Sequence, residues 1–230
     1  MSKDPGEKMP RWWGQEASRL SVAATGDGPN PTARTRIDMP QPIVEDLRAQ
    51  GYPVDTVADL LNKRMRYPDA IPTLLRWLPR IKDPAVKEDI VRALSVPWAR
   101  PAAALPLIHE FREASDDSEF GLRWTIAKAL AVVADDSVFE EVASLLRNKE
   151  YGRAREMLAL ALGNMKTPRA VDVLIESLQD PELAGHAVKA LGKLKAKKAE
   201  SAIRPFTSHE KAWVRAEAKK ALASISKSSR

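Results

Sequence analysis

The chain repeats a short apolar phrase that ends in Ala-Leu. The five pairs are Ala93-Leu94, Ala129-Leu130, Ala161-Leu162, Ala190-Leu191 and Ala221-Leu222. They are separated by 36, 32, 29 and 31 residues. Such a period is typical of helical repeat arrays, in which each supersecondary unit buries its apolar face by stacking on its neighbours. The repetition therefore predicts an extended all-α array rather than a fold built around one catalytic pocket.

Alignment on the alanine shows that each phrase is an amphipathic helix. Seven positions upstream stand small or apolar residues, namely Val86, Leu122, Ala154, Leu183 and Val214. Three positions upstream stand Ile90, Ile126, Leu158, Ala187 and Ala218. Offsets −7, −3, 0 and +1 form one stripe at the 3.6-residue helical period. We interpret this helix as the second of each repeat, and its small alanine column predicts close helix–helix approach.

A first helix is predicted ahead of each second helix. The five segments are 70–78, 104–111, 138–146, 170–178 and 202–206. Breakers lie between helices or repeats, where Asp and Ser cap helices and Pro begins them, at Asp83-Pro84, Ser115-Asp116-Asp117, Thr167-Pro168, Asp180-Pro181 and Ser208. The sequence thus predicts about five helical hairpins.

The chain divides into four predicted parts. Residues 1–38 have no sustained period and are expected to be a disordered tail, and residues 39–66 are expected to form a helical cap from helices over 42–49 and 54–66. The array spans 67–226, and 227–230 form a basic tail. Trp12 and Trp13 in the first tail have open interpretations: docking on the chain itself, simple exposure, or an anchor for a partner or membrane interface.

The array resembles HEAT repeats, best the short phycobilin-lyase-type variety. The resemblance rests on Asp-Pro-Ala-Val-Lys at 83–87, Val-Arg at 214–215 and Ala-Leu-Gly at 161–163 and 190–192. It implies a right-handed α-solenoid whose second helices line the concave face. It also implies that a basic column six positions before the alanine bonds the preceding turn and the neighbouring repeat. That column reads Lys87, Arg123, Arg155, Ala184 and Arg215.

Enzymatic relatives of this fold give specific motifs to look for. Deoxyhypusine hydroxylases bind two irons through His-Glu pairs on second helices, but these columns here read Glu88-Asp89, Trp124-Thr125, Glu156-Met157, Gly185-His186 and Ala216-Glu217. Alkylpurine DNA glycosylases pair a Trp with an Asp, and no carboxylate clearly pairs with Trp124. The chain has no cysteine, which excludes disulfides and thiolate chemistry. We expect no catalytic residue, metal or cofactor; a lyase or glycosylase is the remote alternative.

The predicted concave face carries a mixed-charge stripe. Offsets −5, −4 and −1 share one helical face, so their side chains are expected to line one groove. The candidate partner-binding residues are Arg92, Trp124, Lys128, Glu156, Lys189, Lys193 and Lys220. We expect a noncatalytic scaffold or adaptor that binds a protein or peptide of acidic or mixed charge in this groove, while the alternative for the same face is a merely solvated surface.

Charge supplies a second functional hypothesis. The chain has a net charge of +6, and residues 186–230 hold twelve Lys and Arg against three Glu. This basic end suits an acidic protein or, as the alternative, nucleic-acid phosphate. Its only aromatics, Phe206 and Trp213, are interpreted as core or cap positions, so a base-stacking platform is not expected. No apolar run approaches a membrane span, a cytoplasmic location is expected, and the oligomeric state is left open.

Overall fold

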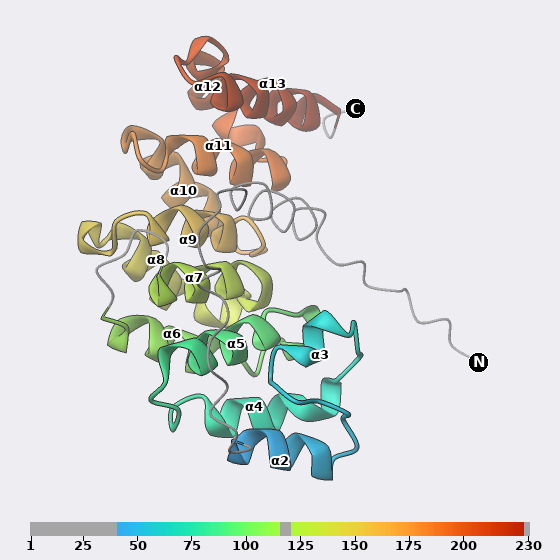
Figure 1. Ribbon diagram of the computed structural model, residues 1–230. Helices are drawn as coiled ribbons and strands as arrows, with labels where there is room; N and C mark the ends of the chain where they lie inside the picture. Colours follow the sequence, from blue (N-terminus) through green and yellow to red (C-terminus); the bar gives the residue numbers. More distant parts are fainter. Residues whose placement is uncertain (1–40, 116–120, 228–230) are drawn as a thin grey trace, which may run out of the picture.

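The computed structural model describes residues 41–115 and 121–227. Within these ranges the chain forms twelve α-helices, α2 to α13, with short 3₁₀ segments and no strand (Figure 1). The predicted tail 1–38, with Trp12 and Trp13, lies outside the described residues, as do residues 228–230. None of the helices in the described ranges combines the length and apolar character needed to cross a membrane.

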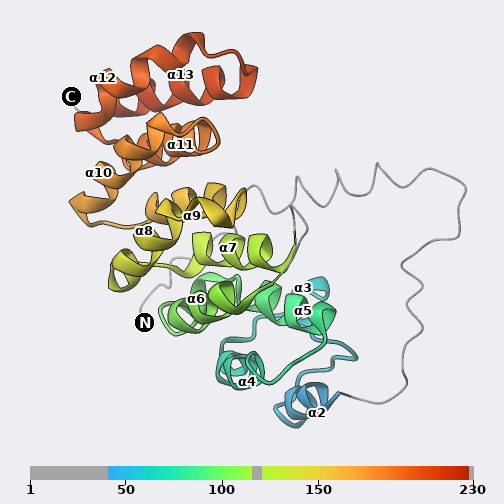
Figure 2. The ribbon, with the colours of Figure 1, turned by 90° about the vertical axis from the view of Figure 1, so that its left-hand side faces the viewer.

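The helices form five sequential pairs that stack along one direction. The pairs are α4 (Ile71–Trp77) with α5 (Pro84–Leu94), α6 (Ala104–Glu113) with α7 (Leu122–Val133), α8 (Phe139–Arg147) with α9 (Ala154–Leu162), α10 (Pro168–Glu176) with α11 (Ala184–Lys193), and α12 (Glu200–Ile203) with α13 (Ala212–Lys227). Figure 2 shows α8, α10 and α12 along one side and α9, α11 and α13 along the other. The predicted all-α hairpin architecture is confirmed.

The aligned alanine column lies in the second helices, as predicted. All five alanines are buried. Helix starts also follow the breakers: the Asp83 carboxylate accepts hydrogen bonds from the backbone N–H groups of Ala85 and Val86, and Pro84 begins α5. The capping carboxylate accepts hydrogen bonds from N–H groups that have no partner within the helix. Proline fits the first turn because it has no N–H group that would be left unpaired there.

Glycines two positions after the alanine set how closely successive second helices pack. A Cβ added at Gly163 would lie 2.8 Å from the Cβ of Ala190, and one added at Gly192 would lie 2.5 Å from the Cβ of Ala221. Each glycine therefore faces the column alanine of the next repeat. The Ala-Leu-Gly phrase is thus a device for close helix packing.

The basic column bonds the places that the resemblance implied. Arg123 donates to the carbonyl oxygens of Phe111 and Ala114, and Arg215 donates to the carbonyl of His209 at 2.7 Å. Arg155 likewise donates to the carbonyl of Gly152 at 3.3 Å, and both Lys87 and Arg155 reach into the following repeat. Lys87 Nζ lies 2.5 Å from Glu110, and the buried Arg155 lies 2.7 Å from Asp180 and 3.0 Å from Glu182. Ala184 in the fourth repeat has no side chain able to make such a bond.

The N-terminal pair differs from the predicted one in its second helix. Helix α2 (Pro42–Ala49) has the predicted bounds, but α3 covers only Asp59–Asn62 instead of 54–66. The Asp59 carboxylate accepts a 2.7 Å hydrogen bond from the N–H of Asp55, so the preceding residues form a turn. Beyond α3, Arg64 has a φ of 51°, which ends the helix. Local turn bonds thus outweigh the helical pattern.

Candidate partner-binding groove

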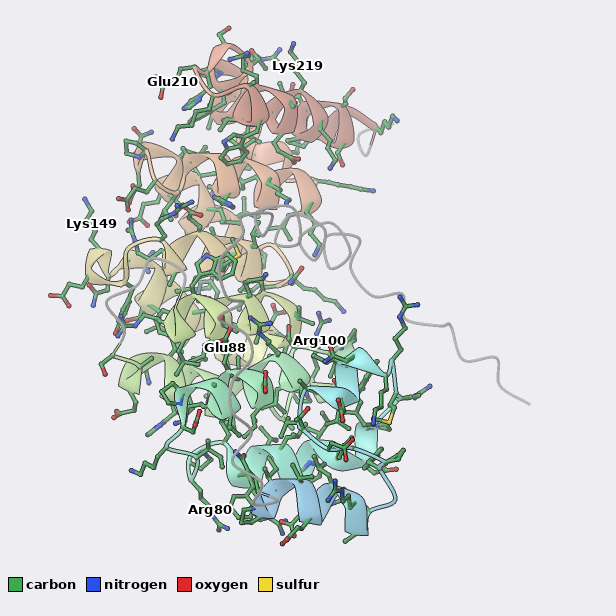
Figure 3. All side chains as sticks on the ribbon, in the orientation of Figure 1. Arg80, Glu88, Arg100, Lys149, Glu210 and Lys219 are labelled. Atoms are coloured by element: carbon green, nitrogen blue, oxygen red, sulfur yellow. The ribbon has the colours of Figure 1, made fainter. Side chains whose placement is uncertain are left out.

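A groove of about 770 Å³ opens along the second helices of repeats two to five. Most of its walls come from offsets −8, −5, −4 and −1 relative to the column alanine, which share one helical face. The lining residues are Trp124, Arg153, Glu156, Met157, Pro181, Glu182, Gly185, His186, Lys189, His209, Lys211, Trp213, Val214 and Glu217. Figure 3 shows the side chains along the array, with Arg80 in the first hairpin and Glu210 and Lys219 in the last.

Trp213 forms an apolar surface at the C-terminal end of the groove. Its side chain stays 45% exposed at the start of α13. A Cβ at Gly185 would lie only 2.1 Å from the indole Cη2, so the absence of a side chain there makes room for the ring. The His186 ring lies next to it, with ring centroids 5.3 Å apart. The exposed indole from α13 therefore packs against a glycine on α11.

Trp124 supplies a second indole from α7. The ammonium of Lys128, one helical turn later, lies 4.5 Å from its ring centroid in a cation–π arrangement. Helix α9 packs between α7 and α11 and contributes the half-buried Met157. Two indoles, an imidazole and a thioether from four successive repeats therefore face one groove.

A buried polar pair lies between these apolar groups. The Glu156 carboxylate is 3.2 Å from Arg153 Nε and 3.8 Å from His186 Nε2. Burial, with Lys189 and Arg153 nearby, lowers the pKa of His186 to about 4. The imidazole is therefore neutral at physiological pH.

The remaining carboxylates of the groove have cations of their own. Glu182 bonds Arg155 at 3.0 Å, although Arg155 also bonds Asp180, and Glu217 lies 3.8 Å from Lys220. Within the described part of the chain, no carboxylate lies within 4.0 Å of the ammonium of Lys189 or Lys211. Both lysines are exposed.

The structure gathers part of the predicted surface. Trp124, Glu156 and Lys189 line the groove, and Lys128 lies against Trp124. The other three residues lie apart from the lining. Arg92 bonds Glu88 at 2.6 Å on α5, Lys193 donates to the Asn164 side chain at the end of α11, and Lys220 lies beyond Glu217 on α13.

Arg153, Lys211 and Trp213 are among the groove residues that sequence reasoning missed. Trp213 is not a core position, because the residue is 45% exposed and lines the groove, although it does lie in the terminal helix α13. Arg153 and Trp213 share offset −8, one turn before the offsets considered, and extending the stripe by one turn would have found both. Phe206 is half-buried and stacks on His209, with centroids 5.9 Å apart.

The side chains of the described residues do not form a metal-binding cluster. Among residues 41–115 and 121–227, no three His, Asp or Glu side chains gather closely enough to hold a metal ion. The groove is instead lined by aromatic, apolar and charged side chains, and its described lining includes no hydroxyl or thiol group.

Comparison with known proteins agrees with the helix pairing. No curated protein matches the chain. A family model described as HEAT repeats matches residues 108–182, which run from α6 to the turn before α11. Proteins with HEAT repeats commonly mediate protein–protein interactions. Over residues 108–182, the family match and the stacked helical hairpins therefore identify HEAT repeats.

Proposed function

We propose that this protein is a noncatalytic interaction scaffold that binds a segment of a partner protein in the groove. The observation that supports this most is the pair of indoles, Trp124 and Trp213, that α7 and α13 bring to one groove. Tryptophan is enriched among residues that dominate binding energy, because it buries a large rigid surface at low entropic cost. A protein segment long enough to contact both would span several repeats.

The polar chemistry of the groove favours binding over catalysis. The Glu156 carboxylate is already engaged by Arg153 at 3.2 Å. The neutral His186 lies 3.8 Å from this carboxylate, and the described lining supplies no hydroxyl or thiol for it to activate. Their contacts support a role in shaping a binding surface.

The nucleic-acid alternative has less support from the basic C-terminal end. Lys197 and Arg204 both bond Glu200, at 2.7 and 2.8 Å, and Lys198 bonds Asp172. These three cations therefore share two carboxylates, which compensate part of their charge. The groove itself contains Glu156, Glu182 and Glu217 among its cations, so its lining is not the continuous basic track that suits a phosphate backbone.

Selection of peptides on the full-length protein tests the proposal. A displayed random peptide library is selected on the immobilised chain, and individual ligands are then measured by fluorescence anisotropy against wild type, Trp213→Ala and Leu105→Ala. Leu105 on α6 is 57% exposed and lies outside the groove lining, which makes it a matched control. We expect Trp213→Ala to weaken binding about 30-fold, the size of a hot-spot truncation.

The control variant and a test for bound nucleic acid show which results would contradict the proposal. Leu105→Ala is expected to leave the affinity unchanged. Ligands that bind equally well to the Trp213→Ala variant would place the interaction surface elsewhere. Recovery of nuclease-sensitive nucleic acid with the purified chain, lost on charge reversal of the C-terminal lysines, would favour the alternative function.

A further inference from the structure

We infer that the groove recognises an acidic protein segment, in which carboxylates flank one apolar anchor side chain. The inference rests on the proposed function and adds the chemistry of the partner. Lys189 and Lys211, whose ammonium groups have no carboxylate within 4.0 Å among residues 41–115 and 121–227, share the groove with the exposed indole of Trp213.

The groove carries charged side chains of both signs. Its formal charges balance, because three cations, Arg153, Lys189 and Lys211, stand against three glutamates. However, each glutamate has a cation of this chain within 4.0 Å: Arg153 beside Glu156, Arg155 beside Glu182 and Lys220 beside Glu217. Two of these partners, Arg155 and Lys220, come from outside the lining. Because Arg155 is shared with Asp180, the groove and these partners together hold five cations against four carboxylates. The excess charge is therefore positive, and among the described residues Lys189 and Lys211 are the lining cations with no carboxylate within 4.0 Å.

The position of the two lysines relates this charge to the apolar surface. Lys189 follows His186 by three residues on α11, so the two side chains share one helical face. Lys211 precedes Trp213 by two residues, just before α13 begins at Ala212. The His186 and Trp213 rings are in turn neighbours, with centroids 5.3 Å apart. The cations and the apolar surface thus belong to the same end of the groove.

Because His186 is neutral, it adds no positive charge to this end of the groove. Of these groups, the lysines attract carboxylates. With a pKa of about 4, the imidazole carries no charge at neutral pH and presents an uncharged aromatic ring beside the indole. An aliphatic or aromatic side chain of the partner fits against these rings. Its neighbouring carboxylates would then form charge-assisted hydrogen bonds with the lysines.

A short acidic peptide suits this surface better than a polyanion. Separated carboxylates can contact Lys189 and Lys211 while avoiding Glu182 and Glu217 on the same groove. An evenly charged phosphate chain cannot, because it places a charge at every nucleotide. The lysines therefore attract an acidic peptide, while the nearby glutamates disfavour an evenly charged polyanion.

Three peptide libraries on the full-length chain test the inference. Each library has a central Phe, Leu or Trp, and its flanking positions are all Asp/Glu, all Ser/Gln or all Lys/Arg. Retention on the immobilised protein is compared for wild type, Lys189→Glu/Lys211→Glu and Lys166→Glu/Lys227→Glu. The last variant makes the same change in net charge at two exposed lysines outside the groove lining.

We expect wild type to retain the acidic library at least tenfold better than the other two. The Lys189→Glu/Lys211→Glu variant should reverse the preference toward the basic library, and Lys166→Glu/Lys227→Glu should preserve it. Circular dichroism checks folding, and Lys189→Gln/Lys211→Gln provides a neutral variant that should lose the preference without reversing it. Equal retention of acidic and neutral libraries by wild type would overturn the inference.

The two proposals fail in different ways. If the neutral library is retained as well as the acidic one, and Trp213→Ala abolishes both, the groove binds protein but does not select acidic segments. If no library depends on Trp213, the proposed function itself is wrong. Displacement of the acidic library by a single-stranded oligonucleotide, lost in Lys189→Glu/Lys211→Glu, would assign the two lysines to nucleic acid and overturn the inference.

Discussion

At the residue scale, His186 shows how a repeat position acquires an environment of its own. It occupies the offset filled by Asp89, Thr125, Met157 and Glu217 in the other repeats. Only 18% of its side chain is exposed, and its Nδ1 atom is buried without a hydrogen-bond partner among the described residues. Protonation would place a charge in this site, so burial holds the pKa at about 4.

The lowered pKa predicts a specific pH dependence of stability. Between pH 6.5 and 4 the unfolded chain binds a proton at His186 that the folded chain does not, so acid favours unfolding. Lowering the pH from 7 to 5 should cost about 1–2 kcal/mol through this residue, with the nearby Glu156 carboxylate reducing the full effect.

Urea unfolding at pH 7 and pH 5 measures this effect. The His186→Gln variant should lose that part of the pH dependence, and His109→Gln, at an exposed position on α6, should keep it. An unchanged difference between the two pH values in His186→Gln would show that His186 does not have the lowered pKa.

At the element scale, the spacing between second helices depends on single methyl groups. Gly192 on α11 faces Ala221 on α13, where an added Cβ would lie 2.5 Å from the alanine Cβ and 2.7 Å from its Cα. The Cα belongs to the backbone, so the contact cannot be relieved by rotating a side chain. The two helices would have to move apart.

We therefore expect Gly192→Ala to lower the free energy of unfolding. The cost of overpacking, about 1–3 kcal/mol, exceeds the gain of about 1 kcal/mol in helix propensity, leaving a net loss of about 1 kcal/mol. Chemical denaturation measures it, and Ala223→Ser provides an exposed control in the same column of the last repeat. A variant as stable as wild type would mean that α11 and α13 separate at little cost.

At the scale of the whole molecule, the array is a stack in which each hairpin covers its neighbours. The groove follows from this arrangement, because α7, α9, α11 and α13 each contribute to one surface. In such a stack, stability is approximately a sum of repeat and interface terms. The last hairpin therefore contributes both to stability and to the groove.

Removal of residues 197–230 tests this coupling. The deletion uncovers the packed face of α11 and removes Trp213 and Lys211, so we expect the melting temperature to fall by roughly 10 °C. Differential scanning calorimetry measures it, and a chain lacking only residues 228–230 is the control. An unchanged melting temperature would mean that the last hairpin does not stabilise its neighbour.

The sequence by itself determined the repeat array, because the buried positions of a helix recur at fixed spacings along the chain. The −7, −3, 0 and +1 stripe placed five second helices, and the basic column indicated where Arg123, Arg155 and Arg215 would bond. Part of the groove was accessible in the same way, since Trp124, Glu156 and Lys189 share one helical face. The right-handed superhelix and the identity of the partner stay predictions.

Only the tertiary structure decided which of these side chains form a site together. Whether Trp213 is core or surface depends on Gly185, which lies 28 residues earlier on another helix and leaves room for the indole. The ion pair from Arg155 to Glu182 likewise joins two repeats. Such contacts arise from the packing of neighbouring hairpins, and no periodicity within one helix encodes them.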